Sequence, residues 1–467
     1  MKMNRIIYLS ALSQILWSCE SRSATERPNI LWIVTEDIGL DMACYGTKGV
    51  YTPNLDQLAK EGALFTNAFT TAPICSPSRS SFMTSLYPTQ VYSHNMRIHP
   101  PFKKQALPGG VHIFTKYMEE AGYATGLCGH PKTDWGFETP QEPVYGTSDW
   151  EELTKQEPFF CQYQFYATHR PFLACKEHPV KAEDIELNPY TADLPEAREE
   201  ERQYLEYLNL LDMQVGELLQ DLKDKGLYEN TIIVFCGDNG PAVIRGKGFL
   251  YDRGIAMPLI VRVPKKFKPQ FKQGAVIEEL VSAMDFAPTF INYAGGEIPD
   301  YIQGRIFLGK NKQAEPEYLF ALRDRHDSMI DRSRSVRSRQ YKYIRNFMPE
   351  NVYWDMSLKN IEAAKVMKKL FEKGELPPLQ AAFFKEKPKE ELYDIVNDPY
   401  EMNNLAEIPK YKETLNQMQA VLDKWIIVTN DEGRLQEDPK DVEEMGRLWE
   451  EFVKKRNERN RQEKQED

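Results

Sequence analysis

The sequence is poor in cysteine and histidine and has no excess of basic residues. It contains seven cysteines and seven histidines in 467 residues. An odd number of cysteines, with no spacing typical of zinc ligands, predicts neither a disulfide framework nor a zinc site. With 59 Lys and Arg against 70 Asp and Glu, the formal net charge is −11, which argues against nucleic acid as a partner. An anionic ligand would therefore need a local basic pocket.

Long apolar runs are also scarce, and the clearest one lies near the amino terminus. A basic start is followed by the apolar segment 6–17 and then by small residues, which is the pattern of an export signal. The run is too short to predict a membrane span. Residues 16–19 (LWSC) resemble a bacterial lipobox, so segment 1–24 predicts either simple cleavage or lipidation at Cys19. We expect a bacterial protein that is exported to the periplasm or held at the outer membrane or cell surface as a lipoprotein, with membrane contact only through this anchor.

The remaining chain is long enough for two domains. Apolar strand-like runs alternate with helical patterns as far as residue 294, which predicts an α/β domain with a large, mostly parallel sheet flanked by helices. The predicted strands there are 29–35, 124–128, 159–166, 231–236 and 258–263, and the predicted helices include 52–59, 112–121, 199–225 and 282–294. We place this domain at 25–335, a smaller α+β domain at 336–435 and a densely charged tail at 436–467.

The segment 72–84 (APICSPSRSSFMT) combines a cysteine, a proline and an arginine at the predicted start of a helix. Pro77 suits the first turn of a helix, and Ser76 is the expected cap. Unpaired N–H groups at a helix start favour an anion, and Arg79 adds a planar cationic fork. The alternative is a loop with a buried structural cysteine at Cys75.

Two pairs of residues with side-chain oxygens follow predicted strands. Glu36 and Asp37 come after strand 29–35, and Asp238 and Asn239 come after strand 231–236. Such pairs are often only solvated loop residues. In a parallel sheet, however, the carboxyl ends of strands form the usual binding edge. The oxygen ligands there suit a hard divalent cation, calcium more readily than a transition metal.

The motif Cys75-Ser76-Pro77-Ser78-Arg79 resembles the Cys-x-Pro-Ser-Arg motif of type I sulfatases, in the alkaline phosphatase-like superfamily. Further matches occur in family order at segments 36–37, 132–136, 166–171, 238–240 and 245–254, and segments 337–347 and 391–405 resemble bacterial glycan sulfatases of the sulfamidase-like type. The chain departs from the family pattern at Glu36, where Asp is common. It departs again at Asp134, where the family has histidine after Lys132.

The resemblance implies that Cys75 is oxidised to formylglycine by a formylglycine-generating enzyme or an anaerobic sulfatase-maturating enzyme. The hydrated aldehyde would attack sulfur with help from one Ca²⁺ ion. The residues implied for the ion are Glu36, Asp37, Asp238, Asn239 and the modified Cys75.

The resemblance also implies roles for residues around the sulfate. Arg79, Lys132 and Lys247 would hold its oxygens, and His169 would protonate the leaving oxygen. We expect Asp134 to act as the base that takes a proton from the formylglycine hydroxyl. Arg323 and His326 would contact sugar, or else lie in a solvated loop.

The expected function is hydrolysis of sulfate esters or N-sulfates of a sulfated saccharide, such as a glycosaminoglycan fragment. One alternative is a phosphoesterase or phosphonate hydrolase of the same superfamily, although the scattered histidines weigh against a second metal ion. The other is a non-catalytic glycan-binding lipoprotein, against which the retained Cys75 and basic residues argue.

Overall fold

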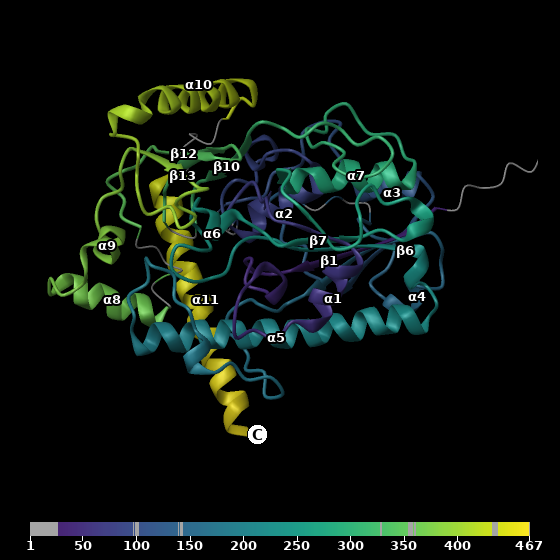
Figure 1. Cartoon of the computed structure of the whole chain (residues 1–467), viewed down its shortest axis with the longest axis horizontal. Coiled ribbons are helices and arrows are strands. Elements are labelled where there is room, and N and C mark those ends of the chain that lie inside the picture. Colours follow the sequence, from purple (N-terminus) through teal and green to yellow (C-terminus); the bar gives the residue numbers. More distant parts are fainter. Residues whose placement is uncertain are drawn as a thin grey trace, which may run out of the picture.

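The computed structural model describes residues 27–466 except 97, 99–101, 139, 141–142, 327–328, 354–357, 359–360 and 432–437. Segment 1–24, with its predicted export signal and Cys19, lies outside the described residues. Figure 1 shows a large sheet with helices on both faces and a smaller sheet beside it. Within the described part of the chain, no helix is both long and apolar enough to cross a membrane.

The larger sheet has the strand order β4-β5-β1-β6-β7-β2-β8. Its strands are β1 (Asn29–Thr35), β2 (Ala63–Phe65), β4 (Ala124–Gly129), β5 (Phe159–Phe165), β6 (Thr231–Gly237), β7 (Leu259–Arg262) and β8 (Ala275–Ile277). Pairs β4-β5, β5-β1, β1-β6 and β2-β8 are parallel, which confirms the predicted mostly parallel sheet. Strand β7 runs antiparallel to both of its neighbours.

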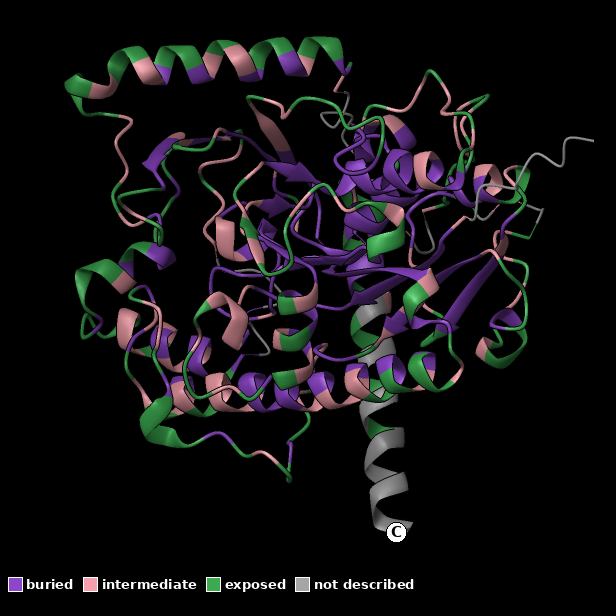
Figure 2. Ribbon diagram, turned by 45° about the vertical axis from the view of Figure 1, so that its right-hand side comes forward, coloured by how far each residue is buried: buried purple, intermediate pink, exposed green. Residues whose placement is uncertain are grey.

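Alternate side chains of the central strand β1 enter two different cores. Trp32 packs among Phe82, Phe114, Phe286 and other residues on the side of helices α2 (Cys75–Thr84), α3 (Thr115–Glu120) and α7 (Phe286–Ala294). Leu31 and Ile33 face helices α1 (Pro53–Glu61) and α5 (Pro195–Asp224) on the other side. Both faces of β1 are buried, as the continuous apolar run 29–35 predicts. Figure 2 shows the long helix α5 with its buried stripe against the sheet.

The helices of the described chain are α1 (Pro53–Glu61), α2 (Cys75–Thr84), α3 (Thr115–Glu120), α4 (Trp150–Leu153), α5 (Pro195–Asp224), α6 (Asp252–Ile255), α7 (Phe286–Ala294), α8 (Glu362–Glu372), α9 (Pro378–Ala381), α10 (Lys412–Val428) and α11 (Pro439–Glu466). The predicted helices 52–59, 112–121, 199–225 and 282–294 correspond to α1, α3, α5 and α7, with ends that differ by a few residues, whereas the short helices α4, α6 and α9 were not predicted. The expected cap of α2 is wrong. Ile74 holds the cap position without a side-chain bond, and Ser76 lies inside the first turn.

The second sheet is antiparallel, with the order β10-β11-β12-β13. Its strands are β10 (Leu319–Arg323), β11 (Ser333–Arg337), β12 (Tyr341–Asn346) and β13 (Glu390–Asp394), and a two-stranded pair β3 (Ala68–Phe69) and β9 (Val281–Ser282) completes the strands. Helix α10 packs on this sheet through Leu415, Met418, Leu422 and Trp425. The predicted domain boundary at 335/336 falls within β11, and β10, which comes before it in the chain, already belongs to the same sheet. The boundary stays a prediction.

Helix α1 depends on α5 for its first hydrogen bonds. Thr52 makes no side-chain cap, and the Asp212 carboxylate instead accepts bonds from the backbone N–H groups of Leu55 at 2.8 Å and Asn54 at 3.1 Å. Because the first N–H groups of a helix have no partner within the helix, the carboxylate of another helix supplies the missing acceptor.

Replacing Asp212 by Ala should lower the free energy of unfolding by about 2 kcal/mol, because buried N–H groups would lose their acceptor. The measurement is the midpoint of denaturant unfolding. Asp224→Ala, at the exposed end of the same helix, is the matched control and should change the midpoint little. Equal losses in the two variants would contradict this role for Asp212.

Candidate active site

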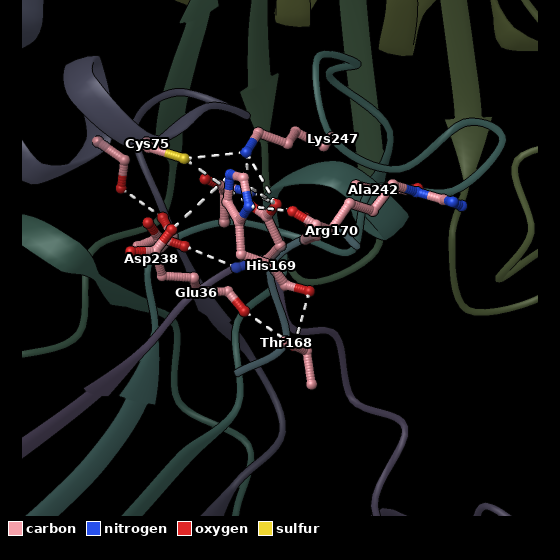
Figure 3. A network of polar contacts seen from close by, with 12 residues as sticks. Glu36, Cys75, Thr168, His169, Arg170, Asp238, Ala242 and Lys247 are labelled. Carbon is pink, nitrogen blue, oxygen red and sulfur yellow. Dashed lines mark hydrogen bonds and ion pairs between the residues drawn. The ribbon is translucent and has the colours of Figure 1, made fainter. Parts of the chain in front are cut away.

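Four neighbouring strands deliver polar residues to one edge of the sheet. Thr35, the last residue of β1, is level with Phe165 of β5 and Gly237 of β6. The residues that follow these strands therefore meet at one place. Lys132 and Asp134 follow β4, His169 follows β5, Glu36 and Asp37 follow β1, and Asp238 and Asn239 follow β6. Figure 3 shows Glu36, His169 and Asp238 gathered next to Cys75.

Helix α2 presents Cys75 and Arg79 to this edge, and every one of its residues is buried. Arg79 Nε donates to Asp238 Oδ2 at 2.9 Å, and Arg79 Nη1 donates to Gln164 Oε1 at 2.7 Å. Ser78 Oγ donates to the Asp238 carbonyl oxygen at 2.5 Å. The helix is therefore fixed to the end of β6 by side chains one turn after Cys75.

The Cys75 thiol lies between an ammonium and a carboxylate. Lys247 Nζ donates to Cys75 Sγ at 3.0 Å, and the thiol faces Asp37 Oδ1 at 3.6 Å. Burial raises the pKa of the thiol well above its usual value, in spite of the nearby Lys132 and Lys247. The unmodified cysteine is therefore a neutral thiol at neutral pH and a poor nucleophile.

Three carboxylates crowd the site within a short distance of the thiol. Three atoms that could coordinate a metal ion lie within 4.8 Å of one another: a carboxylate oxygen of Glu36, Sγ of Cys75 and a carboxylate oxygen of Asp238. Asp37 adds a carboxylate whose two oxygens lie 2.6 and 2.8 Å from Lys247 Nζ. Burial alone would raise the pKa of Asp37, but Lys247 and His169 outweigh it and hold the pKa well below its usual range. Asp37 is therefore ionised at neutral pH.

The oxygens of this cluster fit a hard divalent cation. Glu36 Oε1 and Asn239 Oδ1 are both buried and lack a hydrogen-bond donor. Buried oxygens without a donor are costly, and a cation that they coordinate would satisfy them. The four predicted oxygen ligands, Glu36, Asp37, Asp238 and Asn239, are thus brought together, and the donor set suits Ca²⁺ or Mg²⁺.

Lys132 joins the cluster from the end of β4. Its Nζ lies 2.6 Å from Glu36 Oε2 and 3.4 Å from Asp134 Oδ2. Burial alone would lower the pKa of Lys132, but the surrounding acidic groups outweigh it and hold the pKa above its usual value. The contact of Asp134 in the site is with this ammonium. His130 instead packs its ring 5.1 Å from that of Tyr166, on the exposed side.

The imidazole of His169 faces the carboxylates through Nε2, which lies 4.0 Å from both Glu36 Oε2 and Asp37 Oδ2. On its other side, Nδ1 lies 2.7 Å from the carbonyl oxygen of Arg170 and 2.9 Å from the hydroxyl of Tyr166. The carbonyl can only accept, so Nδ1 carries a proton and Nε2 is the nitrogen free to titrate. Burial lowers the pKa of His169.

Arg323 and His326 are each 6% exposed, so their expected place in a solvated loop is wrong. Arg323 lies 3.5 Å from Asp331, and its guanidinium stacks over Phe249. His326 pairs through its backbone with Met96, which packs against Cys75. Their contact with sugar stays a prediction.

Two residues that support the site were not predicted from the sequence. Gln164 holds Arg79, and the Thr168 hydroxyl donates to the carbonyl oxygens of Glu36 at 2.8 Å and Asp37 at 3.1 Å. The available signal was a glutamine repeated at alternate positions of an apolar strand, because such a side chain is buried and needs a partner.

Comparison with known proteins gives the class of molecule. The sulfatase family model matches residues 28–152 and 146–296. The model of the N-sulphoglucosamine sulphohydrolase carboxyl-terminal region matches residues 243–382. The chain therefore belongs to the sulfatase family, and it is a sulfuric ester hydrolase.

Individual relatives agree with this assignment. An ulvan-active sulfatase of Formosa agariphila is 32% identical over 96% of this chain and 84% of its own. Human N-sulphoglucosamine sulphohydrolase is 26% identical over 90% of this chain and 93% of its own. A solved structure described as being in complex with its substrate D-glucosamine-2-N,6-O-disulfate superposes with a TM-score of 0.60 at 20% identity, and it covers 88% of this chain and 99% of its own.

Metal-free protein titrated with CaCl₂ should bind the ion and melt at a higher temperature, because binding to the folded state alone stabilises it. Glu36→Gln should weaken binding at least about tenfold, since it removes a charged ligand. Glu186→Gln, in an exposed ion pair with Lys48, is the control. The metal assignment would be contradicted if millimolar Ca²⁺ gave no heat of binding and no shift in melting temperature.

Proposed function

We propose that this sulfatase removes sulfate esters or N-sulfates from sulfated glycans. The observation that carries the proposal is the buried Cys75 at the start of α2, with Lys247 on its sulfur and Lys132 and Arg79 close by. This arrangement supports a buried, positively charged binding site for a tetrahedral oxyanion next to residue 75. The names of the relatives, an ulvan-active sulfatase and N-sulphoglucosamine sulphohydrolase, support a sulfated saccharide as the substrate.

Two groups complete the chemistry. We infer that Cys75 is converted to formylglycine, whose hydrated form supplies a nucleophilic oxygen and a route for sulfate release that a thiol lacks, and that Ca²⁺ supplies a Lewis acid. Glu36, Asp37, Asp238 and Asn239 would hold the ion. The modification requires a formylglycine-generating or anaerobic maturating enzyme as a partner. We also propose that the protein is exported, as a periplasmic protein or as a lipoprotein anchored at Cys19.

The side chains of the chain itself have separate tasks. Lys132 and Lys247 would bind sulfate oxygens and offset the negative charge that develops as the ester bond breaks. Arg79 would orient the sulfate, and its hydrogen bond to the Asp238 carboxylate would keep that residue in place. His169 Nε2 would donate a proton to the leaving oxygen from the doubly protonated imidazole. Because burial lowers the pKa of His169, this form is the minor one at neutral pH but a stronger acid than an exposed imidazolium.

The contact between Asp134 and Lys132 favours a role for Asp134 in positioning that lysine. Because it lies 3.4 Å from Lys132 Nζ, its carboxylate would hold that ammonium between itself and Glu36. The proposed task as a base at residue 75 would require it to approach Cys75 when substrate binds. Both tasks make Asp134 important for turnover, whereas the exposed ring of His130 packs on Tyr166.

Phosphoryl chemistry is the second candidate function. A phosphonate monoester hydrolase from Silicibacter pomeroyi superposes with a TM-score of 0.63 at 17% identity and covers 86% of this chain and 96% of its own, which is a likeness of fold alone. Turnover of an aryl sulfate and the matching aryl phosphate by the same preparation separates the two functions. Sulfate turnover should exceed phosphate turnover, and the reverse order would contradict the proposal.

Cys75→Ala should abolish sulfate-ester turnover while leaving the melting temperature almost unchanged. The reason is that one small side chain at a helix start contributes little to packing, whereas the nucleophile is lost. Mass spectrometry of the peptide that carries residue 75 should find formylglycine in active wild-type protein. Substantial activity of the Ala variant, or of protein that carries only unmodified cysteine, would rule out this mechanism.

Lys132→Ala and Asp134→Ala should each lower kcat by about 100-fold or more, the scale of one electrostatic or acid–base group. His130→Ala, two residues away from Lys132, is the matched control and should be mild. Steady-state kinetics on a soluble sulfated substrate give the comparison. A crippled His130 variant beside a nearly normal Asp134 variant would show that His130 is the residue the reaction uses.

A further inference from the structure

The histidine segment, residues 166–170, connects the end of β5 to a stretch of chain at the surface. On its amino side, the backbone N–H of Thr168 donates to the Glu36 carbonyl oxygen at 3.0 Å, which ties the segment to the end of β1. On its carboxyl side, the chain reaches the surface within a few residues, and Leu173 is 51% exposed. The contacts of the Arg170 side chain therefore support the segment on this second side.

The guanidinium of Arg170 contacts two other parts of the fold. Its Nε donates to the carbonyl oxygen of Ala242 at 2.9 Å, and its Nη2 lies 3.5 Å from Glu200 Oε2 on α5. The guanidinium carbon also lies 4.3 Å from the ring centre of Phe172. Figure 3 shows Arg170 extending from His169 to Ala242. Because the guanidinium is planar and carries several fixed donors, one side chain joins the histidine segment both to a helix and to a second loop.

The loop that contains Ala242 is a firm support for this contact. The carbonyl oxygen of Pro241 accepts from the backbone N–H of Lys247 at 2.7 Å. The Lys247 ammonium in turn lies 2.6 and 2.8 Å from the two carboxylate oxygens of Asp37. Loss of the bond from Arg170 would leave these contacts in place, whereas the histidine segment would lose a support.

Arg170 also holds the imidazole directly, through its backbone. The Nδ1–H of His169 donates to the Arg170 carbonyl oxygen at 2.7 Å, and the Tyr166 hydroxyl lies 2.9 Å from the same nitrogen. The opposite ring nitrogen, Nε2, lies 4.0 Å from Glu36 Oε2 and from Asp37 Oδ2. Because a partner on one ring nitrogen sets the direction of the other, a shift of the Arg170 carbonyl would turn Nε2 within the site.

We propose that Arg170 is a positioning residue, which holds the imidazole of His169 so that Nε2 faces the leaving oxygen of the substrate. Its side chain anchors the carbonyl that orients the ring, and it does so from the loop that carries Lys247 and from α5. This inference rests on the proposed function, in which His169 donates a proton. Misplacement of a reacting group by about 1 Å can cost about 100-fold in rate, so this support matters for turnover.

The leaving group of the substrate shows whether Arg170 acts through the proton donor. Phenolate is a poor leaving group and needs a proton, whereas 4-nitrophenolate leaves with little help. In Arg170→Met, kcat/KM should therefore fall at least about tenfold with phenyl sulfate and less than about threefold with 4-nitrophenyl sulfate. Equal losses with the two substrates would overturn the proposal, because general damage to the site affects both alike.

Two further variants control this comparison. Arg170→Lys keeps a donor for the Ala242 carbonyl oxygen and should recover part of the loss with phenyl sulfate. Arg198→Met removes an arginine that pairs with Asp193 at the start of α5, and it should match the wild type with both substrates. If Arg170→Met does not fold, Glu200→Gln weakens the other contact of the guanidinium and should change the ratio of the two rates in the same direction.

A double-mutant cycle separates this inference from the proposed function. In a His169→Ala background, Arg170→Met should cause little further loss with phenyl sulfate, because its effect passes through the imidazole. A further loss as large as in the wild type would contradict the proposal. An unimpaired Arg170→Met variant beside an impaired His169→Ala variant would contradict this inference alone, whereas full turnover by His169→Ala would contradict the proposed task of His169 and this inference with it.

Crystal structures of the full-length wild type and of Arg170→Met give a readout that needs no turnover and no modification of Cys75. We expect the imidazole of His169 to be displaced or to occupy several positions in the variant, while Thr168 keeps its bonds to the end of β1. An imidazole in the same place and orientation in both structures would overturn the proposal.

Discussion

The site depends on the mutual compensation of buried charges at the carboxyl edge of the sheet. Asp238 is held by Arg79, Asp37 by Lys247 and Glu36 by Lys132, each within hydrogen-bond distance. Removing one partner from such a pair leaves an uncompensated buried charge, which typically costs about 3–5 kcal/mol. The pairs therefore fix the ends of β1, β4 and β6 and the start of α2 relative to one another. The same charges that stabilise this edge are those that a cation and a sulfate would share.

Parallel pairing of β4, β5, β1 and β6 makes this clustering possible. A parallel strand carries its following loop to the same edge as its neighbours, so residues far apart in sequence meet there. The glycines of the Lys247 loop then allow close packing behind the edge. A Cβ on Gly240 would lie 1.9 Å from the carbonyl oxygen of Arg253, and one on Gly246 would lie 2.1 Å from that of Pro241. The loop can therefore fold tightly enough for Lys247 to reach both Asp37 and Cys75.

Much of the sheet could be predicted because it follows local rules, whereas most of the site residues were predicted from the resemblance to type I sulfatases. Apolar runs mark strands, and polar residues at strand ends mark the binding edge, as Asp37 and Asp238 illustrate. The cap of α2 could not be predicted, because Ser76 is taken into a helix that starts earlier and is fixed by tertiary bonds to Asp238. The burial of Arg323 also depends on tertiary contacts, here with Phe249 and Asp331. Local sequence carries no trace of such contacts, so charged residues there suggest only a solvated loop.

The two departures from the family pattern, at Glu36 and Asp134, meet at one ammonium. The longer side chain of Glu36 brings Oε2 to 2.6 Å from Lys132 Nζ, and Asp134 approaches the same nitrogen at 3.4 Å. A histidine at position 134 would add a donor to this corner, whereas Asp134 adds negative charge and would repel sulfate if Lys132 did not lie between them. If a cation drew Glu36 toward itself, Lys132 would become free to face a sulfate while Asp134 still restrained it. The second carboxylate on Lys132 would then allow the lysine to keep its place while its partner changed from Glu36 to the substrate.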